Sequence, residues 1–451
     1  MRELLEDAAA RAVAYLEDLP SRRVVPSEEA VAALAGFDQP WPDAPRPAEE
    51  TLQRLDELGS PATMAAAAGR FFGFVTGGAL PVTVASNWLA TAWDQNSAHH
   101  GPAPATAAIE QVALRWLLQA LALPPGAAGA FVTGATMANF SALAAARHAV
   151  LERAGWDVEA DGLCGAPPIT VLVSEEVHPT VLKALGLVGL GRRRVLRLPV
   201  DGQGRVRADA LPRISGPAIV CLQAGNVNTG AFDPFAELIP AAQAQGAWVH
   251  VDGAFGLWAR ASDALRPLAD GVEQADSWAT DAHKWLNVPY DSGIAFVRDG
   301  AALRAAMSVS AVYLPAESEQ RNPSDYTPEL SRRARGVDVW AALHTLGRSG
   351  LAGLVQRCCR HARRFAHELR EAGATVLNEV VLNQVLVSFG DDDTTRRVVA
   401  ALQAEGTCWC GITVWQGHTA MRISVSSWAT TDDDVTRSLD PMRRLMRQAR
   451  G

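Results

Sequence analysis

The stretch from Thr280 to Gly293, TDAHKWLNVPYDSG, decides how the rest of the chain is interpreted. It places Lys284 between a histidine and the apolar pair Trp285-Leu286, shortly before the strand-like segment Gly293–Val297. A lysine in apolar surroundings loses hydration, which lowers its pKa and makes the neutral amine available as a nucleophile. Such an amine suits Schiff-base formation with a carbonyl compound. Most lysines are solvated surface residues, so this interpretation requires the chain to supply the other parts of such a site.

Length and composition indicate a soluble globular protein with more than one folding unit. The chain has 451 residues, of which 48% are hydrophobic and 20% charged, and its net charge is −8. No basic stripe suggests nucleic-acid binding. The six cysteines show no zinc-binding spacing. We therefore expect no metal, reduced thiols and a cytoplasmic location.

Two stretches without charged residues, Phe71–Trp93 and Trp116–Ala146, are long enough to suggest membrane spans. Each is interrupted by Gly, Pro, Thr or Asn, so we interpret both as buried segments and expect no membrane association. The first 19 residues read as an acidic amphipathic helix without the features of a signal peptide.

Apolar strands alternate with helices through the middle of the chain. We predict strands at Ala130–Thr133, Ile169–Ser174, Arg194–Val200, Ala218–Ala224, Trp248–Ala254 and Gly293–Val297. This alternation is typical of a mostly parallel α/β sheet covered on both faces, which binds ligands at the carboxyl ends of its strands. A smaller α+β unit follows, with strands at Gln384–Phe389 and Met421–Val425 around a helix at Thr394–Glu405.

These elements predict three parts. Residues 1–85 form an N-terminal helical segment, 86–345 the large domain and 346–451 the small domain. The N-terminal segment is too thin to hold a core of its own, so we expect it to be a dimerisation segment that packs on another subunit.

Small and polar residues follow several predicted strands. Thr133-Gly134-Ala135-Thr136 lies between a strand and a helix, where free backbone amides suit a phosphate. An ordinary tight turn with a Thr N-cap is the alternative. His178 follows the strand Ile169–Ser174, and an imidazole there could stack on a planar cofactor or simply cap a helix.

Asp252 ends the apolar strand that begins at Trp248, and a carboxylate at that position needs a charged partner such as a pyridinium nitrogen or a metal. Ala254 is expected to share its face, and His250 to point to the opposite face. The proline-broken loop Ala301–Thr327 contains Tyr326, which is either a solvated aromatic or a proton donor on a mobile lid.

A phosphate cradle, a stacking imidazole, a carboxylate for a ring nitrogen and a Schiff-base lysine are together what pyridoxal 5'-phosphate requires. They occur in the order in which a parallel sheet would present them. We therefore predict pyridoxal 5'-phosphate (PLP) as the cofactor.

The chain resembles the group II PLP-dependent amino-acid decarboxylases over roughly residues 50 to 445. The matching segments are TGATMANFSALAAAR (133–147), SEEVHPTVLKAL (174–185), GNVNTGAFDPF (225–235), WVHVDGAFG (248–256), ADSWATDAHKWLNVPYDSG (275–293) and DYTPELSRRARGVDVWAALHTLGR (325–348). The resemblance implies a fold type I aminotransferase-like architecture, with the active site at a homodimer interface.

The resemblance also implies roles for single residues. Lys284 would carry the internal aldimine, Asp252 would hold the pyridinium, and His178 would stack on the ring with Ala254 on its other face. Decarboxylation would pass through an external aldimine and a quinonoid. Tyr326 resembles the lid tyrosine that returns a proton to Cα, a step that water could also perform.

By the same resemblance, Ala135, Thr136 and His283 would contact the phosphate, with Asp281 as a further contact. Asn228 lies where the family has a polar residue near the cofactor.

The substrate is expected to be an aromatic L-amino acid, released as its amine and carbon dioxide. The stretch FFGFVT (71–76), with Phe74, Val75 and Thr76, resembles the aromatic-rich pocket of the family's aromatic members, although it could also be a core strand. The pair His99-His100 departs from the family pattern and would be either surface residues or contacts to a polar substrate side chain.

Two other functions stay open. Fold type I enzymes also perform transamination and oxidative deamination to aldehydes. Loss of the lid tyrosine or the stacking histidine is associated with the aldehyde-forming branch, and the presence of Tyr326 and His178 favours simple decarboxylation. A non-catalytic PLP-binding relative is the remote alternative, which the intact Lys284 and Asp252 oppose.

Overall fold

The computed structural model describes residues 1–309 and 320–450. The chain falls into two units, one of residues 1–76, 363–377 and 385–451 and the other of residues 77–362 and 378–384. The contacts thus group the N-terminal helices with the C-terminal part of the chain. The expected division at residues 85 and 345 stays a prediction.

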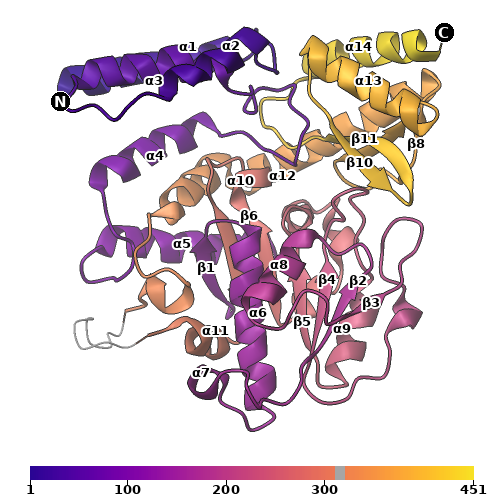
Figure 1. The fold of residues 1–451 in the computed structure, drawn as a ribbon. Coiled ribbons are helices and arrows are strands. Elements are labelled where there is room, and N and C mark those ends of the chain that lie inside the picture. The colour runs from indigo at the N-terminus through magenta and orange to yellow at the C-terminus, as the bar shows by residue number, and fades with distance from the viewer. Residues whose placement is uncertain (310–319, 451) are drawn as a thin grey trace. The chain divides into compact units, whose positions relative to one another are not determined.

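A seven-stranded sheet forms the centre of the second unit (Figure 1). Its order is β1-β7-β6-β5-β4-β2-β3, and β7 runs antiparallel to both of its neighbours while the other pairs are parallel. Every residue of β4 to β7 is buried, as a sheet covered on both faces requires. The strands are β1 (Ala128–Val132), β2 (Thr170–Ser174), β3 (Val195–Leu198), β4 (Ala218–Gln223), β5 (Trp248–Asp252), β6 (Ser277–Asp281) and β7 (Gly293–Val297).

Helix α6 (Ala135–Glu152) lies along one face of this sheet and contacts β1, β4, β5, β6 and β7 (Figure 1). Its alanines let the helix approach the strands closely, and most of its residues are buried. The remaining helices of the unit are α4 (Pro81–Trp93), α5 (Pro104–Ala120), α7 (Val158–Asp161), α8 (Pro179–Leu187), α9 (Phe235–Gln243), α10 (Ala282–Trp285), α11 (Gly300–Met307) and the first part of α12 (Arg335–Glu371). Helix α12 is interrupted at Gly347, whose φ is 59°.

The first unit combines helices with a four-stranded sheet of order β10-β11-β9-β8. Its N-terminal helices are α1 (Arg2–Asp18), α2 (Glu28–Ala33) and α3 (Ala48–Ala62). The later elements are β8 (Thr375–Val376), β9 (Gln384–Ser388), α13 (Asp392–Glu405), β10 (Gly411–Trp415), β11 (His418–Ser424) and α14 (Asp432–Arg450). Aspartates begin α14 and arginines end it, which matches the helix dipole.

The expected α/β class and the expected strands are confirmed, and three strands, β6, β8 and β10, were missed. The sequence of β6 is SWATD and that of β10 is GITVW. β6 is buried on both faces and still contains polar residues, so its sequence shows neither an apolar run nor the alternation that identifies a strand. The segment 71–76 forms an isolated bridge at Phe71 rather than a strand.

The expectation that residues 71–93 are buried is wrong for α4. Trp88 is 45% exposed, Leu89 56% and Trp93 43% in the single chain. No helix among residues 1–309 and 320–450 is both long and apolar enough to cross a bilayer.

The carboxyl ends of the parallel strands gather several of the expected site residues at one edge of the sheet. Asp252 ends β5 and Asp281 ends the neighbouring β6. Gly134 follows β1, and Gly293 begins the antiparallel β7 at the same edge. This edge therefore positions the candidate site.

Candidate active site

Lys284 lies in the short helix α10, directly after β6. Its Nζ is 2.6 Å from Oδ2 of Asp281, and the Asp281 side chain is 2% exposed. The other carboxylate oxygen of Asp281 accepts a hydrogen bond from the Ala135 amide at 2.6 Å. Asp281 therefore joins the lysine to the first residue of α6.

This ion pair reverses the expected shift of the lysine. Burial lowers the pKa of Lys284, but the charge and hydrogen bond of Asp281 outweigh it, so the net pKa is raised. The expectation of a lowered pKa is wrong for this state, because it rested on the apolar neighbours of Lys284, whereas the structure pairs the ammonium with Asp281 three residues earlier. The lysine is held as an ammonium and must lose a proton before it can act as a nucleophile.

The turn between β1 and α6 forms a small cradle. A Cβ at Gly134 would lie 3.2 Å from Cε1 of His283 and 3.5 Å from Oδ1 of Asp281, so the absence of a side chain leaves this space open. Nδ1 of His283 accepts a hydrogen bond from the Ser292 amide at 3.0 Å, and Nε2 lies 3.5 Å from Asp281 Oδ1. Burial is the main cause that lowers the pKa of His283.

These groups fit an anion such as the phosphate of PLP. The α6 N-terminus and Nε2–H of His283 supply donors. The Ser292 hydroxyl is also buried and lacks a hydrogen-bond partner among the described residues. Thr136 begins the same helix turn. Asp281 faces this cradle as an acceptor, so while ionised it cannot donate to a phosphate, and the structure instead pairs it with Lys284.

Asp252 is buried at the end of β5, with 5% of its surface exposed. Oδ1 accepts from the Ala254 amide at 3.2 Å, and Oδ2 accepts from Nδ2 of Asn139 at 3.3 Å. Burial raises the pKa of Asp252, and the charges of His178 and Lys284 oppose this rise. A buried carboxylate with cationic neighbours fits the positively charged ring nitrogen of PLP.

His178 is the N-cap of α8 and is half-buried. Its Nδ1 lies 2.7 Å from the Thr180 hydroxyl, which fixes the orientation of the imidazole. Ala254 connects the two aspartate strands, because its carbonyl accepts from the Asp281 amide at 2.9 Å. Lys284, Asp281, Asp252, His178 and Ala254 are thus brought together at one edge.

Asn228 lies in the loop that follows β4, the strand beside β5. Its amide donates to Oδ1 of Asn226 at 2.9 Å, and its side chain is buried. The loop packs on the turn after β5, since a Cβ at Gly225 would lie 2.9 Å from Cα of Gly256. These contacts place Asn228 near the edge that carries Asp252.

Within one chain, Tyr326 lies near the amino end of β1, whereas Lys284 lies beyond the carboxyl end of β6. The guanidinium of Arg321 stacks 4.2 Å from its ring and donates to the carbonyl of Gly129, near the amino end of β1. Gly129 is three residues before the end of β1, or about 10 Å along the strand. The lid loop expected around Tyr326 also includes residues 310–319, which lie outside the described residues.

His99 and His100 adjoin Tyr326 rather than Lys284. The Ser324 amide donates to the carbonyl of Ala98 at 3.0 Å, and the His100 amide donates to Oδ1 of Asn322 at 3.1 Å. The two histidines therefore belong to a different region of this chain from Lys284.

Phe74, Val75 and Thr76 directly precede Gly77 in the sequence, and Gly77 contacts the backbone of Lys284. A Cβ at Gly77 would overlap the carbonyl oxygen of Lys284, so the two backbones touch. Because consecutive Cα atoms are 3.8 Å apart, Cα of Phe74 lies within about 11 Å of Cα of Gly77. Phe74 is 64% exposed and has a φ of 53°.

Sequence reasoning missed a buried set behind Asp252. Asn139 hydrogen-bonds both Asp252 and His250, so the expectation that His250 points away is wrong. Residues two apart in a strand share a face, which the sequence alone could have shown. No pattern singled out Asn139, or Ser277, which bonds the other ring nitrogen of His250.

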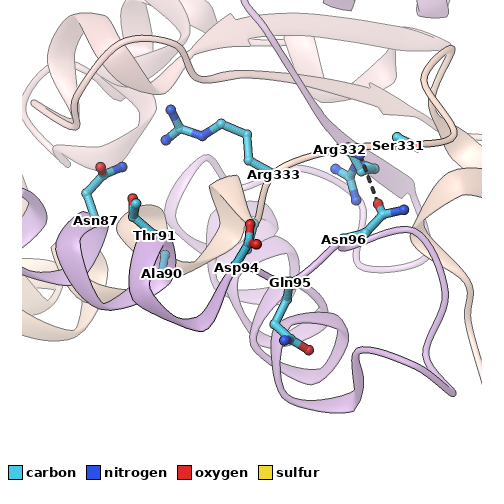
Figure 2. A pocket seen from close by; sticks show the side chains of 10 residues that line it. Asn87, Ala90, Thr91, Asp94, Gln95, Asn96, Ser331, Arg332 and Arg333 are labelled. Carbon is cyan, nitrogen blue, oxygen red and sulfur yellow. Dashed lines mark hydrogen bonds between the residues drawn. The ribbon is translucent and has the colours of Figure 1, made fainter. Parts of the chain in front are cut away.

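A separate cavity of about 560 Å³ opens between α4 and the segment before α12 (Figure 2). Figure 2 shows the Arg332 backbone bonded to Asn96, with Asp94 and Arg333 on the same wall. Its lining residues carry none of the expected site roles. The chemistry-bearing side chains gather at the sheet edge instead.

A family model described as the pyridoxal-dependent decarboxylase conserved domain matches residues 33–390. L-2,4-Diaminobutyrate decarboxylase of Rhizobium meliloti (strain 1021) is 30% identical over 388 residues, which cover 81% of this chain and 74% of that protein. Aromatic-L-amino-acid decarboxylase of Bacillus atrophaeus is 31% identical over 290 residues, covering 61% and 58% respectively.

Solved structures share the fold. Oryza sativa TDC, solved with PLP and tryptamine, matches with a TM-score of 0.91 at 23% identity and covers 99% of this chain and 97% of its own. Mouse CSAD also reaches a TM-score of 0.91, at 21% identity and 98% coverage of both chains.

Proposed function

We propose a substrate class and residue roles for this chain, which belongs to the pyridoxal-dependent decarboxylase family and is a PLP-dependent amino-acid decarboxylase. The cofactor and family expected from the sequence are confirmed. The proposed reaction removes carbon dioxide from an aromatic L-amino acid and releases the amine.

The proposed roles follow from the geometry at the sheet edge. Lys284 would supply the amine that holds the cofactor, and Asp281, whose Oδ2 is 2.6 Å from the Lys284 Nζ, would take the proton that the ammonium must lose. Asp252 holds a proton at the cofactor ring nitrogen, and His178 orients the ring. When bound, PLP supplies an electron-accepting ring that stabilises the charge left on Cα as carbon dioxide departs.

The phosphate contacts stay a proposal built on the cradle. Ala135, Thr136 and His283 would bind the phosphate, and the orphaned Ser292 hydroxyl is an additional candidate. Asn228 is proposed near the cofactor from its place beside β5.

The return of a proton to Cα is assigned to water or to a group from a second subunit. Within one chain, Tyr326 packs against Arg321 away from Lys284. Tyr326→Phe tests its role, with Tyr313→Phe as companion, because Tyr313 is the other tyrosine between residues 298 and 334 and lies outside the described residues. A large loss of kcat in one variant alone would identify the donor.

The aromatic substrate class is supported by the stretch FFGFVT (71–76), with Phe74, Val75 and Thr76, which resembles the aromatic-rich pocket of the family's aromatic members. Phe74 packs on Trp409 at 5.2 Å between ring centroids and tilted by 30°, and Trp409 stacks on Phe71 at 5.1 Å. Aromatic surfaces favour flat apolar ligands.

A panel of amino acids tests this proposal. Carbon dioxide release should be fastest with an aromatic L-amino acid, and slower with 2,4-diaminobutyrate, histidine and acidic amino acids. Preference for diaminobutyrate would overturn the aromatic assignment and would agree with the similarity to the Rhizobium meliloti L-2,4-diaminobutyrate decarboxylase. Lys284→Ala is the control without turnover.

The same assay separates decarboxylation from aldehyde formation and transamination. One neighbour in fold, at 20% identity, is titled Rhodiola rosea 4-hydroxyphenylacetaldehyde synthase. We expect amine and carbon dioxide in equal amounts, without hydrogen peroxide. Aldehyde and peroxide at the level of carbon dioxide would assign the oxidative branch instead.

A homodimer is proposed as the working form. Helices α1, α2 and α3 contain no buried residue in the single chain, and each exposes large apolar side chains such as Leu5, Val31 and Leu55. Helix α4 exposes Trp88, Leu89 and Trp93 as well. Exposed apolar patches of this kind mark protein interfaces.

A further inference from the structure

A buried chain of hydrogen bonds runs from Asp252 away from the cofactor side. Nδ2 of Asn139 donates to Oδ2 of Asp252 at 3.3 Å, and Oδ1 of Asn139 lies 2.8 Å from Nε2 of His250. Nδ1 of His250 is 2.9 Å from the Ser277 hydroxyl, which receives the indole N–H of Trp248 at 2.9 Å. Each of the five side chains is at most 5% exposed.

The two ends fix the direction of this chain. The Trp248 indole can only donate, so Ser277 accepts from it and is left with its own proton to give to Nδ1 of His250. His250 then carries its proton on Nε2 and donates to the Asn139 carbonyl oxygen. The Asn139 amide nitrogen finally faces Asp252, which must be an acceptor.

The reverse arrangement fails at the Trp248 end. If Asp252 were protonated and donated to Asn139, the amide would turn and donate to Nε2 of His250. His250 would then donate from Nδ1 to Ser277, which would receive two donors and have no acceptor for its own buried proton within the chain. The hydrogen bonds thus require Oδ2 of Asp252 to accept, and because the Ala254 amide donates to Oδ1, both carboxylate oxygens face donors, as the ionised form of Asp252 requires.

We propose that Asn139, His250, Ser277 and Trp248 are positioning residues that keep Asp252 ionised and aimed at the cofactor ring nitrogen. This inference rests on the role proposed above for Asp252. No metal or further charge is required, because the chain acts through the orientation of its donors.

The site needs such a device. Burial raises the pKa of Asp252, and the carboxylate of Asp281 acts in the same direction. His178 and Lys284 oppose the rise, and the nearby Cys221 thiol has its own pKa raised to about 12 and stays neutral. The amide of Asn139, a neutral donor, also opposes the rise in the pKa of Asp252, and it does so without bringing another charge into the sheet.

His250 itself stays uncharged in this arrangement. Burial lowers its pKa to about 3, and the hydrogen bond at Ser277 opposes this shift. A neutral imidazole with a defined tautomer transmits the donor direction from Trp248 to Asn139.

The first test uses the cofactor-free protein labelled with ¹⁵N-histidine. One histidine should show a protonated Nε2 and a bare Nδ1 unchanged from about pH 5 to pH 9, and His250→Gln should remove that signal. A His250 that titrates near its ordinary pKa, or that carries its proton on Nδ1, would overturn the proposed direction. This result does not depend on cofactor binding.

The second test measures the Kd of PLP and the pH at which the absorption of bound PLP changes. Asn139→Leu should weaken PLP binding about tenfold and shift that pH, Ser277→Ala about threefold, and Trp248→Phe less. Ser141→Ala is the matched control, since Ser141 is a buried serine on α6 whose hydroxyl donates to the Met137 carbonyl and takes no part in the hydrogen bonds between Asp252 and Trp248. Its Kd should stay unchanged.

The outcomes separate positioning from simple packing. If the loss of PLP affinity follows the order of the residues along the hydrogen-bond chain from Asp252 to Trp248, while the loss of Tm does not, the proposal stands. If Asn139→Leu and Ser277→Ala both retain the original Kd and pH, it is overturned. Should Asn139→Leu fail to fold, Ser277→Ala against Ser141→Ala decides. An unchanged Kd in Asp252→Asn would instead refute the role of Asp252, while the tautomer result would still hold.

Discussion

At the scale of single residues, the Lys284–Asp281 pair defines the resting state of the site. The buried ammonium is held by a carboxylate at 2.6 Å, so in the proposed role Lys284 would first pass a proton to Asp281. The protonation state of Lys284 thus depends on a specific partner and not on apolar burial alone.

Asp281→Asn should lower the pKa of Lys284, because the burial that lowers it remains while the opposite charge and hydrogen bond that raise it are lost. The pH midpoint for attachment of PLP to the cofactor-free protein should fall accordingly. Borohydride trapping followed by mass spectrometry measures this attachment. Lys284→Ala, which should trap nothing, is the control, and an unchanged midpoint would contradict the assigned partner.

His250 predicts a loss of stability in acid. The folded state holds the pKa of His250 near 3, whereas the unfolded chain takes up a proton below about 6.5, so unfolding binds a proton as pH falls. Between pH 6.5 and pH 5 the free energy of unfolding should drop by about 2 kcal/mol from this group.

Urea unfolding of the cofactor-free protein measures that drop. In His250→Gln the contribution should be absent, so the stability difference between the original protein and the variant should shrink by about 2 kcal/mol over the same range. A difference that does not change with pH would mean that His250 is not held neutral.

Much of the site could be predicted from single positions. Asp252 ends β5 and His178 follows β2, so the predicted topology brings both to one edge, whereas β6, the strand before Lys284, was not predicted. The role of Asn139 could not be predicted, because it depends on a contact between distant elements. Asn139 and Asp252 are 113 positions apart in the sequence, and no local pattern signals their hydrogen bond.

At the scale of elements, helix α6 and strands β5 and β6 build the site together. The helix supplies the cradle at its N-terminus and, one turn later, the amide that reaches Asp252. β6 was not predicted because its polar residues are used internally, with Ser277 bonding His250 and Trp248. Buried polar strands of this kind lack the period that identifies ordinary strands.

The segment 71–76 was expected as either a core strand or a pocket wall, and it forms no strand. Phe71 and Phe74 instead pack on Trp409, just before β10. A Cβ at Gly73 would overlap the Trp409 ring, so the indole fits closely between the two phenylalanines. We infer that Trp409 holds Phe74 in place.

Trp409→Ala should therefore raise the KM for an aromatic substrate about three- to tenfold while kcat changes less than twofold, because a loosened wall weakens binding and leaves the reacting groups intact. Steady-state kinetics check this. Trp41→Ala is the control, since Trp41 is 93% exposed. Equal kinetics in Trp409→Ala would remove the aromatic wall from the substrate proposal.

At the scale of the whole molecule, the apolar surface left open by a single chain is the main unexplained feature. The N-terminal helices pair through Arg11 and Asp56 at 3.0 Å and through Tyr15 and Thr63 at 2.9 Å, all polar contacts. Their apolar side chains, including Leu5 and Val13, stay exposed. The sequence predicted this, because a short helical segment cannot bury both of its faces.

The double variant Leu89→Arg and Trp93→Arg should shift the protein from dimer to monomer. Two buried charges without partners cost several kcal/mol at the core of an interface, so the Kd for association should rise by at least about 100-fold. Analytical ultracentrifugation over a range of protein concentrations measures this, and decarboxylase activity should fall with the dimer fraction.

Leu196→Arg provides the matched control for that experiment. Leu196 lies on β3, the outermost strand of the large sheet, and is 53% exposed, similar to Leu89 at 56%. Unlike Leu89, it lies outside helices α1 to α4, which expose the apolar side chains. This variant should remain dimeric and active. If both variants dissociate the dimer, added charge acts non-specifically. If the dimer survives the double variant in α4, the interface lies elsewhere and α4 is left for another partner.

Loss of activity on dissociation by the α4 double variant alone would also favour a site completed by the second subunit, because Tyr326 and His99 lie away from Lys284 in one chain.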